Sequence, residues 1–294
     1  MTRLLAPAVL AIAATAGLIA QESQDQEGAL AQFSSQVQLV EVYATVTDAK
    51  GQPVTGLKRE DFEVYEDNAL QDVSTFAAGE FPLTVALGVD RSWSMAGDKL
   101  RLAKQASQSF LRALKPDDRS MVVAINNDAE VIAPLTMDRF NQGRAIEALD
   151  PWSTTALHDA IIATLDRLAP EPGRQALVIF SDGTDRYSKA SAAAVVERAR
   201  RSNALIYLIA FGRERSPLLA ELAVVTGGRS FLLRDVKDLD KTLADVAREL
   251  RYQYLLGYTP TDPIDAAHAE WRSIRVVPKK PGVKVRARDG YMTD

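Results

Sequence analysis

Two kinds of hydrophobic pattern divide the chain. Apolar and polar residues alternate near its ends, whereas its middle holds wholly apolar runs separated by segments with helical spacing. Residues 37–47 place valine or alanine at every second position from Val40 onward, which is typical of a half-buried strand. Short strands are also predicted at 61–66 and 73–76. Residues 37–80 therefore form a predicted β module that has too few strands to bury much apolar surface alone.

Strands and helices alternate regularly between residues 81 and 251. Apolar strands are expected at 83–89, 120–125, 131–135, 176–180, 205–211 and 230–233. Amphipathic helices are expected at 100–114, 139–149, 156–168, 190–201, 217–226 and 239–251. This alternation is typical of a doubly wound α/β domain, in which a mostly parallel sheet carries helices on both faces.

The pattern returns to β structure after residue 251. Strands are expected at 252–258, 273–277 and 283–287. Together the two β stretches supply about six strands, which is a common sheet size. We therefore predict that residues 37–80 and 252–294 form one discontinuous, β-sandwich-like domain into which the α/β domain, residues 81–251, is inserted. Insertion is feasible because the ends of a domain often lie close together.

The first twenty residues differ from the rest of the chain. Arg3 is followed by an uncharged run, rich in alanine and leucine, that extends to Ala20. This pattern predicts a secretory signal peptide at residues 1–20, cleaved near Ala20 and followed by a polar linker at 21–36. A retained anchor is the alternative, since the run only just reaches spanning length. We expect an exported protein, periplasmic or extracellular, with no membrane span once the signal is removed.

Composition excludes several kinds of function. Apolar residues make up 47% of the chain and charged residues 25%, so a globular core can form. The formal net charge of −4 gives no reason to expect nucleic acid or an anionic membrane as a partner. The chain has no cysteine, which excludes disulfides, thiolate metal sites and thiol catalysis.

The most informative short motif follows the apolar strand at 83–89. Asp90, Ser92 and Ser94 stand two residues apart on the loop at the carboxyl end of that strand. Carboxylate and hydroxyl oxygens are hard ligands that suit Mg²⁺, Mn²⁺ or Ca²⁺. Each serine also has an ordinary explanation as the cap of the next helix.

Two later segments supply further oxygen atoms. Asp182 follows the apolar strand at 176–180, and Thr155 precedes the helix expected at 156–168. Ligands of open α/β sheets bind beyond the carboxyl ends of the strands, so these residues reach the same crevice as Asp90 if their strands are neighbours. Taken alone, Thr155 fits a helix cap and Asp182 fits a turn. The joint occurrence of two carboxylates and three hydroxyls favours a metal site.

These residues resemble the metal-ion-dependent adhesion site of the von Willebrand factor A domain family. Asp90, Ser92 and Ser94 match its first element, Thr155 its second and Asp182 its third, within a resemblance that covers roughly residues 81–251. The resemblance implies that the three hydroxyls bind Mg²⁺, or Mn²⁺ or Ca²⁺, directly. The two aspartates would act largely through water, and an acidic residue of a partner protein would complete the coordination.

The flanks resemble a bacterial group of such proteins, the acidobacterial-type relatives. The matching segments are Asp61-Phe62-Glu63-Val64-Tyr65-Glu66-Asp67, Tyr254-Leu255-Leu256-Gly257-Tyr258 and Gly290-Tyr291. Within the site, Trp93 stands where the family often has glycine, and Trp152 shortly precedes Thr155. Most tryptophans pack in a core. We nevertheless interpret Trp93 and Trp152 as partner contacts, because Trp93 lies between two predicted ligands on a loop.

Two enzyme classes compete with this interpretation. Phosphatases of the haloacid dehalogenase type also place an aspartate after the first strand, but they need a second carboxylate two residues later, where this chain has Ser92. A serine hydrolase needs a general base, and the two histidines are His158, in a predicted helix, and His268, in a predicted loop. We therefore predict a protein that is not an enzyme.

A structural role is the other alternative. The metal site would then be incidental, and the β domain would dock into an assembly of the cell envelope. Residues 272–288 hold seven basic and no acidic side chains, which we interpret as a solvated strand face. The prediction is an exported protein-binding module of the adhesion type.

Overall fold

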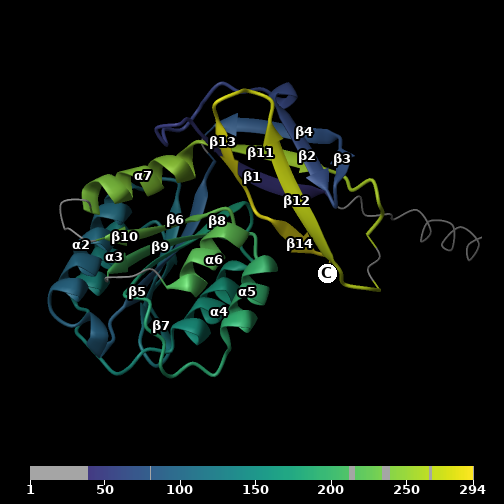
Figure 1. Cartoon of the computed structure of the whole chain (residues 1–294). Helices are drawn as coiled ribbons and strands as arrows, with labels where there is room; N and C mark the ends of the chain where they lie inside the picture. Colours follow the sequence, from purple (N-terminus) through teal and green to yellow (C-terminus); the bar gives the residue numbers. More distant parts are fainter. Residues whose placement is uncertain (1–38, 80, 212–215, 234–238, 265–266, 294) are drawn as a thin grey trace, which may run out of the picture. The chain divides into compact units, whose positions relative to one another are not determined.

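The computed structural model describes residues 39–79, 81–211, 216–233, 239–264 and 267–293 (Figure 1). The predicted signal peptide, residues 1–20, and the predicted linker, residues 21–36, lie outside these ranges. Within the ranges, no helix combines the length and the apolar character that crossing a membrane requires.

A six-stranded sheet forms the centre of the α/β region. Its strands are β5 (Leu83–Asp90), β6 (Arg119–Ile125), β7 (Ala129–Thr136), β8 (Arg174–Ser181), β9 (Leu205–Phe211) and β10 (Arg229–Leu233). The order is β10-β9-β8-β5-β6-β7, with β7 antiparallel to β6 and all other neighbours parallel. Every residue of β5 and β8 is buried, as expected for parallel strands that are covered on both faces. The predicted α/β fold is confirmed.

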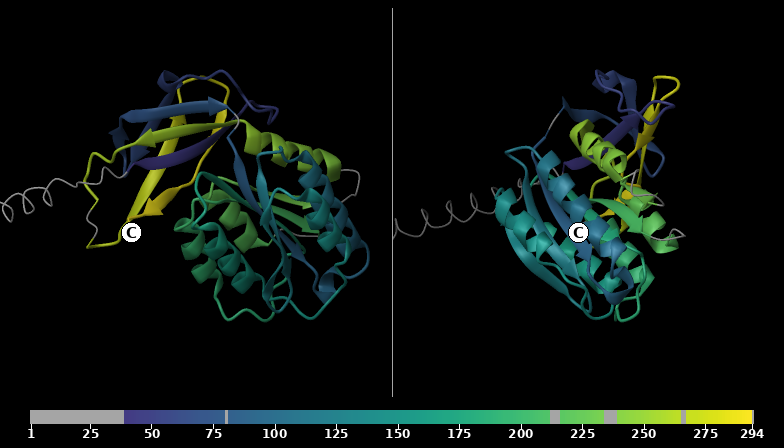
Figure 2. Two further views of the ribbon diagram at one scale, coloured as in Figure 1. Left: turned by 180° about the vertical axis from the view of Figure 1, so that it is seen from behind. Right: turned by 90° about the vertical axis from the view of Figure 1, so that its left-hand side faces the viewer.

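Helices cover both faces of this sheet (Figure 2). They are α2 (Asp98–Ala113), α3 (Arg139–Glu147), α4 (Leu157–Leu168), α5 (Ala192–Arg200), α6 (Pro217–Val225) and α7 (Leu239–Arg251). One apolar cluster joins α2, α3 and α7 to the sheet, and a second joins α4, α5 and α6 to it. Leu87 of β5 belongs to the first cluster and Ala86 to the second, because successive side chains of a strand point to opposite faces.

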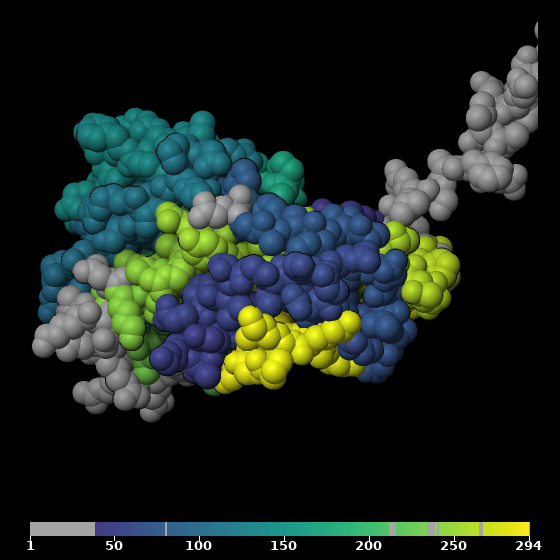
Figure 3. Space-filling model, turned by 90° about the horizontal axis from the view of Figure 1, so that it is seen from above, coloured from purple at the N-terminus to yellow at the C-terminus, as the bar shows by residue number. Residues whose placement is uncertain are grey.

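Strands from both ends of the described chain pair with each other. One four-stranded sheet has the order β13-β1-β11-β4 and contains Lys284–Arg286, Val40–Thr47, Gln253–Tyr258 and Val73–Gly79. The other has the order β14-β12-β2-β3 and contains Gly290–Met292, Trp271–Pro278, Phe62–Glu66 and Ala69–Gln71. Figure 3 shows the early and late segments side by side. The division of the chain into separate domains stays a prediction.

A buried hydrogen-bond network connects the three flanking motifs. The carboxylate of Glu66 accepts hydrogen bonds from the hydroxyls of Tyr258 at 2.7 Å and Tyr291 at 2.9 Å. The guanidinium of Arg272 donates to the same carboxylate at 3.1 Å. Burial, together with the hydrogen bonds to Glu66, raises the pKa of both tyrosine hydroxyls. Both tyrosines therefore stay protonated and serve as donors, which explains their pairing with a buried acid in these motifs.

The predicted solvated basic face at residues 272–288 is wrong in part. The side chain of Arg272 is only 3% exposed, because its guanidinium is paired with the equally buried Glu66. Arg286 lies 2.7 Å from the carboxylate of Glu249, which is 2% exposed. The alternation of residue types could not reveal these two partners, since both acids lie far away in the sequence.

Candidate metal centre

The carboxyl end of β5 holds the centre of the candidate site. Asp90, its last residue, is fully buried. Its Oδ1 accepts a hydrogen bond from the backbone N–H of Ser92 at 2.9 Å, and its Oδ2 accepts one from the hydroxyl of Ser181 at 2.6 Å. Ser181 ends β8, which pairs with β5. The strands that precede Asp90 and Asp182 are therefore neighbours, as a shared crevice requires.

Ser92 and Ser94 present their hydroxyls to each other. Their Oγ atoms lie 3.1 Å apart, at the turn of 3₁₀ helix formed by Trp93–Met95. The buried side chain of Met95 anchors this turn in the core. The capping explanation for the serines is wrong, because neither side chain caps the 3₁₀ turn or α2, whose cap is Gly97. Two hydroxyls are thus available above the buried carboxylate.

Asp182 follows β8 and stands beside this group. Its Oδ2 accepts a hydrogen bond from Nζ of Lys99 at 2.8 Å, and its Oδ1 accepts one from the backbone N–H of Thr184 at 3.1 Å. This contact joins the Asp182 side chain to the backbone two residues later, but residues 182–185 form no hydrogen-bonded backbone turn, so the predicted turn is wrong. Burial raises the pKa of the Asp182 carboxyl, but the hydrogen bonds from Lys99 and Thr184 outweigh burial and lower it. Asp182 is thus held as a carboxylate.

The pKa of Asp90 moves in the opposite direction. Burial raises the pKa of this carboxyl above its ordinary value, and the hydrogen bonds from Ser181 and Ser92 only partly oppose the shift. The negative charge of Asp182 raises it further. The charge of Asp182 thus disfavours ionisation of the buried Asp90, and a cation bound near both carboxyls would offset this repulsion.

The backbone of Thr155 is hydrogen-bonded to the loop that follows Asp182. It is buried, and its carbonyl oxygen accepts hydrogen bonds from the N–H groups of Arg186 and Tyr187, both at 3.0 Å. The residue at the N-cap of α4 is Ala156, and the N–H of Leu157 donates to the Asp185 carboxylate at 2.7 Å, so the capping explanation for Thr155 is wrong. The Thr155 hydroxyl is therefore free of that role.

The loop before Thr155 is bonded to the loop after β5. Trp152 N–H donates to the Arg91 carbonyl at 2.7 Å, and Trp93 N–H donates to the Ser153 carbonyl at 3.0 Å. Hydrogen bonds thus join Asp90, Ser92 and Ser94 directly, while Asp182 and Thr155 reach the group through neighbouring residues. All five predicted residues therefore lie on three loops that contact one another.

The donor chemistry of these residues fits a hard divalent cation. In the described part of the chain, no cluster of three or more histidine, cysteine, aspartate or glutamate residues could hold a metal ion. A metal bound here therefore depends on hydroxyl ligands as well as on the two carboxylates. Such oxygen donors suit Mg²⁺, Mn²⁺ and Ca²⁺.

Three exposed aromatic residues belong to the loops of the site and form what we call its aromatic rim. Trp93 is 64% exposed, Trp152 is 59% exposed and Tyr187 is 69% exposed. The first two belong to the loops joined by the hydrogen bonds described above, and Tyr187 is bonded to the backbone of Thr155. The alternative that Trp93 and Trp152 pack in the core is therefore wrong.

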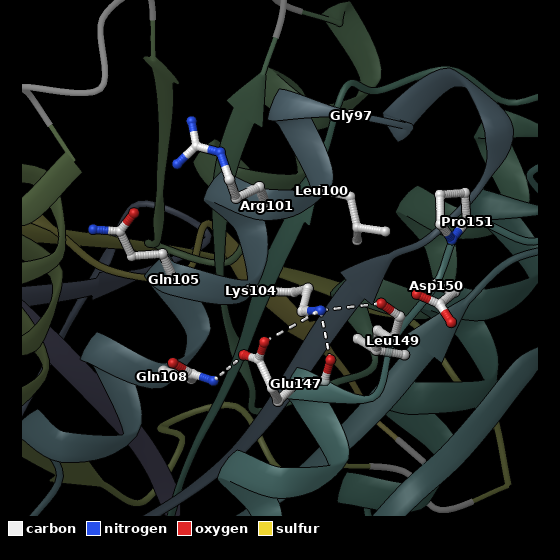
Figure 4. A pocket seen from close by; sticks show the side chains of 10 residues that line it. All are labelled: Gly97, Leu100, Arg101, Lys104, Gln105, Gln108, Glu147, Leu149, Asp150 and Pro151. Atoms are coloured by element: carbon white, nitrogen blue, oxygen red, sulfur yellow. Dashed lines mark hydrogen bonds and ion pairs between the residues drawn. The ribbon is translucent and has the colours of Figure 1, made fainter.

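A polar groove opens next to this aromatic rim. It has a volume of about 320 Å³ and lies between α2 and residues 147–151, with Gly97 and Pro151 in its wall (Figure 4). Lys104 crosses it, and its ammonium donates to the carbonyl of Leu149 at 3.2 Å. Lys104 thus ties α2 to the segment between α3 and Trp152, and Trp152 is part of the aromatic rim.

Three residues of the site were not predicted from the sequence. Ser181, Lys99 and Tyr187 contact predicted site residues, but each belongs to a different segment from its partner. Ser181 had a usable signal, since it ends an apolar strand directly before Asp182. Lys99 and Tyr187 had none, because a lysine in a helix and a tyrosine in a loop are ordinary surface residues.

The fold and site define a class of protein, the open α/β domains that carry a polar site at the carboxyl ends of the central parallel strands. The family model of the von Willebrand factor type A domain matches residues 85–245, more than half of the chain. The chain belongs to this family, which confirms the resemblance.

The relatives that match are distant. The chain is 21% identical over 202 residues to human inter-alpha-trypsin inhibitor heavy chain H4, covering 63% of this chain and 22% of that protein. It is 23% identical over 209 residues to a UPF0353 protein of Mycobacterium leprae, covering 59% of this chain and 62% of that protein. The chain therefore spans less than two thirds of these relatives.

Solved structures share the fold. A von Willebrand factor type A protein of Catenulispora acidiphila gives a TM-score of 0.52 at 16% identity, covering 89% of this chain and 74% of that chain. Proximal thread matrix protein 1 of the mussel byssus gives a TM-score of 0.53 at 17% identity, covering 63% of this chain and 50% of that chain. The latter structure is described as having a zinc-occupied MIDAS motif.

Proposed function

We propose that this protein binds a divalent cation and uses it to bind an acidic group of a partner protein. The proposed ligands are Asp90, Ser92, Ser94, Thr155 and Asp182. The observation that carries the proposal is the 3.1 Å separation of the Ser92 and Ser94 hydroxyls, close in sequence to the fully buried Asp90, with neither hydroxyl used in a capping hydrogen bond. Mg²⁺ is the proposed ion, with Mn²⁺ or Ca²⁺ as alternatives.

The proposed ligands would have different roles. Hydroxyl ligands are neutral, so Ser92, Ser94 and Thr155 would leave most of the ion's charge available to a partner. Asp90 is buried and already accepts two hydrogen bonds, which suits a role in orienting the loop and attracting the cation. When bound, the ion would supply the positive charge that a carboxylate of the partner recognises.

The aromatic rim favours a partner whose acidic residue has apolar neighbours. Trp93, Trp152 and Tyr187 offer large exposed ring surfaces beside the proposed ion. Tryptophan and tyrosine dominate the centres of protein interfaces because they bury much apolar area with few rotatable bonds. A partner segment with an aspartate or glutamate between bulky apolar residues would use both features.

A binding role suits the described side chains better than catalysis. His158 sits on α4, where its Nδ1 lies 3.0 Å from the carbonyl oxygen of Ala190 and 3.7 Å from the Asp185 carboxylate. These contacts fix its ring against the loop after β8 rather than beside Ser92.

Export of the protein belongs to the same proposal. The uncharged run that extends to Ala20 supports secretion to the periplasm or the cell exterior. We also propose that the strands before and after the α/β region form a separate domain that frames the binding site.

Titration calorimetry with Mg²⁺, Mn²⁺ and Ca²⁺ tests the proposal. The wild type should bind at least one of these ions, and Asp90→Ala and Ser94→Ala should lose binding. Asp98→Ala is the matched control, because Asp98 lies at the start of α2 with an 85% exposed side chain that pairs with Arg101. Wild-type protein that binds none of the three ions would refute the proposal, as would equal binding by Asp90→Ala.

A further inference from the structure

The ammonium of Lys99 contacts two parts of the candidate metal centre at once. Its Nζ donates to the Asp182 carboxylate at 2.8 Å and to the backbone carbonyl of Ser94 at 3.0 Å. The side chain of Asp182 is 6% exposed, whereas that of Lys99 is 42% exposed. The ion pair therefore joins a carboxylate fixed in the crevice to a cation that can turn outward into solvent.

The helix does not favour a lysine at this position. Lys99 is the second residue of α2, and the partial positive charge of a helix N-terminus disfavours a cation there. Asp98, the first residue, is the type of residue expected at such a terminus. The contacts of Lys99 with Asp182 and Ser94 offset this unfavourable placement. The contacts of Lys99 with the candidate site, and not its position in the helix, therefore account for a lysine at this residue.

We propose that Lys99 is a tethered competitor of the divalent cation. Its ammonium neutralises Asp182 and repels a second positive charge, so it must swing outward before a dication can use that carboxylate. This inference rests on the proposed function, since it requires Asp182 to serve a metal. Lys99 thereby sets how tightly the site holds its ion, and it keeps Asp182 paired when divalent ions are scarce.

The test measures metal affinity and thermal stability in Lys99 variants. Lys99→Met and Lys99→Gln both remove the charge. The polar glutamine variant provides the affinity measurement if the methionine variant folds poorly. Lys99→Arg keeps the charge. Arg101→Met is the matched control, because Arg101 belongs to the same turn of α2 but pairs with Asp98 and not with the site. Calorimetry uses Mg²⁺ and Mn²⁺, and melting is followed with chelator and with Mg²⁺.

The two neutral variants should bind both ions about two- to fivefold more tightly, the range expected for a partly exposed ion pair. With chelator they should melt below the wild type, since a buried carboxylate loses its partner, and Mg²⁺ should raise their melting temperature more than that of the wild type. Lys99→Arg should stay within about twofold of wild-type affinity, as should Arg101→Met.

The outcomes separate this inference from the proposed function. Unchanged or weaker metal binding by both neutral variants, with wild-type binding that depends on Asp90, overturns the role of Lys99 and leaves the proposed function standing. Equal tightening by Arg101→Met also overturns it, because net charge alone would then explain the effect. Absence of metal binding in the wild type and in every variant refutes both proposals.

Discussion

The Oγ of Ser181 lies 2.6 Å from Oδ2 of Asp90, although 91 positions separate the two residues in the chain. Parallel pairing of β5 and β8 brings these strand ends together. The hydrogen bond satisfies a carboxylate oxygen that is fully buried. The site therefore depends on a serine that is not itself one of the five proposed ligands.

Replacement of Ser181 by alanine should weaken both the fold and the site. An unsatisfied buried acceptor costs about 1–3 kcal/mol in the free energy of unfolding. Loss of a residue that orients a metal ligand should lower Mg²⁺ affinity by about tenfold or more. Urea unfolding and calorimetry measure the two effects. Ser107→Ala is the control, since Ser107 is equally buried but donates to Ala103 within α2. Equal metal affinity in the Ser181 and Ser107 variants would contradict the assigned role.

The two exposed tryptophans should report metal binding by fluorescence. Paramagnetic Mn²⁺ quenches nearby indole rings, and Trp93 and Trp152 lie on the loops that carry the proposed ligands. The third tryptophan, Trp271, lies on β12 against Arg200 and is the control. Trp271→Phe should keep the quenching that Mn²⁺ produces, and a Trp93→Phe, Trp152→Phe double variant should lose most of it. Quenching that follows Trp271 instead would place the ion elsewhere.

The aromatic rim should affect partner binding without affecting the metal. Trp93→Ala and Tyr187→Ala remove exposed side chains, so stability should change by less than about 0.5 kcal/mol. Affinity for peptides selected on the wild type in Mg²⁺ should fall by about 2 kcal/mol for a central contact, while Mg²⁺ affinity stays constant. Phe140→Ala provides the comparison, because Phe140 is 73% exposed on α3, outside the rim. Peptide binding that is indifferent to both rim variants would remove the rim from the interface.

Removal of the buried acid Glu66 should destabilise the protein without changing metal binding. Glu66→Gln removes the buried one of the two carboxylates that pair with Arg272, since Glu270 also lies 2.7 Å from its guanidinium; breaking a buried ion pair costs up to about 3–5 kcal/mol. Tyr291→Phe removes one hydrogen bond to the same carboxylate and should cost about 1 kcal/mol. Chemical denaturation measures both values. A Glu66→Gln variant as stable as the wild type would show that the network is dispensable.

Glycine 228 provides a steric test of the packing beside β10. A Cβ atom at this residue would lie 2.0 Å from the carbonyl oxygen of Ile206 in β9, so Gly228→Ala should cost about 1–3 kcal/mol or more. Gly143 in α3 has no atom within 4 Å of the same added carbon. Gly143→Ala should instead stabilise the protein by about 0.5–1 kcal/mol, because alanine is the better helix former. Matched urea unfolding curves compare the two variants.

The local pattern of residues was sufficient for most of the secondary structure. The period of apolar residues predicted strands such as β5 and helices such as α2 to within a few residues, because that period depends only on near neighbours. Strands β3 and β14, of three residues each, were missed. Asp90, Ser92 and Ser94 were recognisable because they follow one another in the chain.

Tertiary structure alone decided which distant residues complete these groups. Ser181 joins Asp90 because β8 lies beside β5, and Lys99 reaches Asp182 because α2 begins over the same crevice. Tyr258 and Tyr291 meet at Glu66 across 192 and 225 positions. A local pattern carries no information about such contacts, since each depends on strand order and on the packing of elements that are remote in sequence. The sequence determined which elements and ligand types exist, and the folded chain determined which charges face one another.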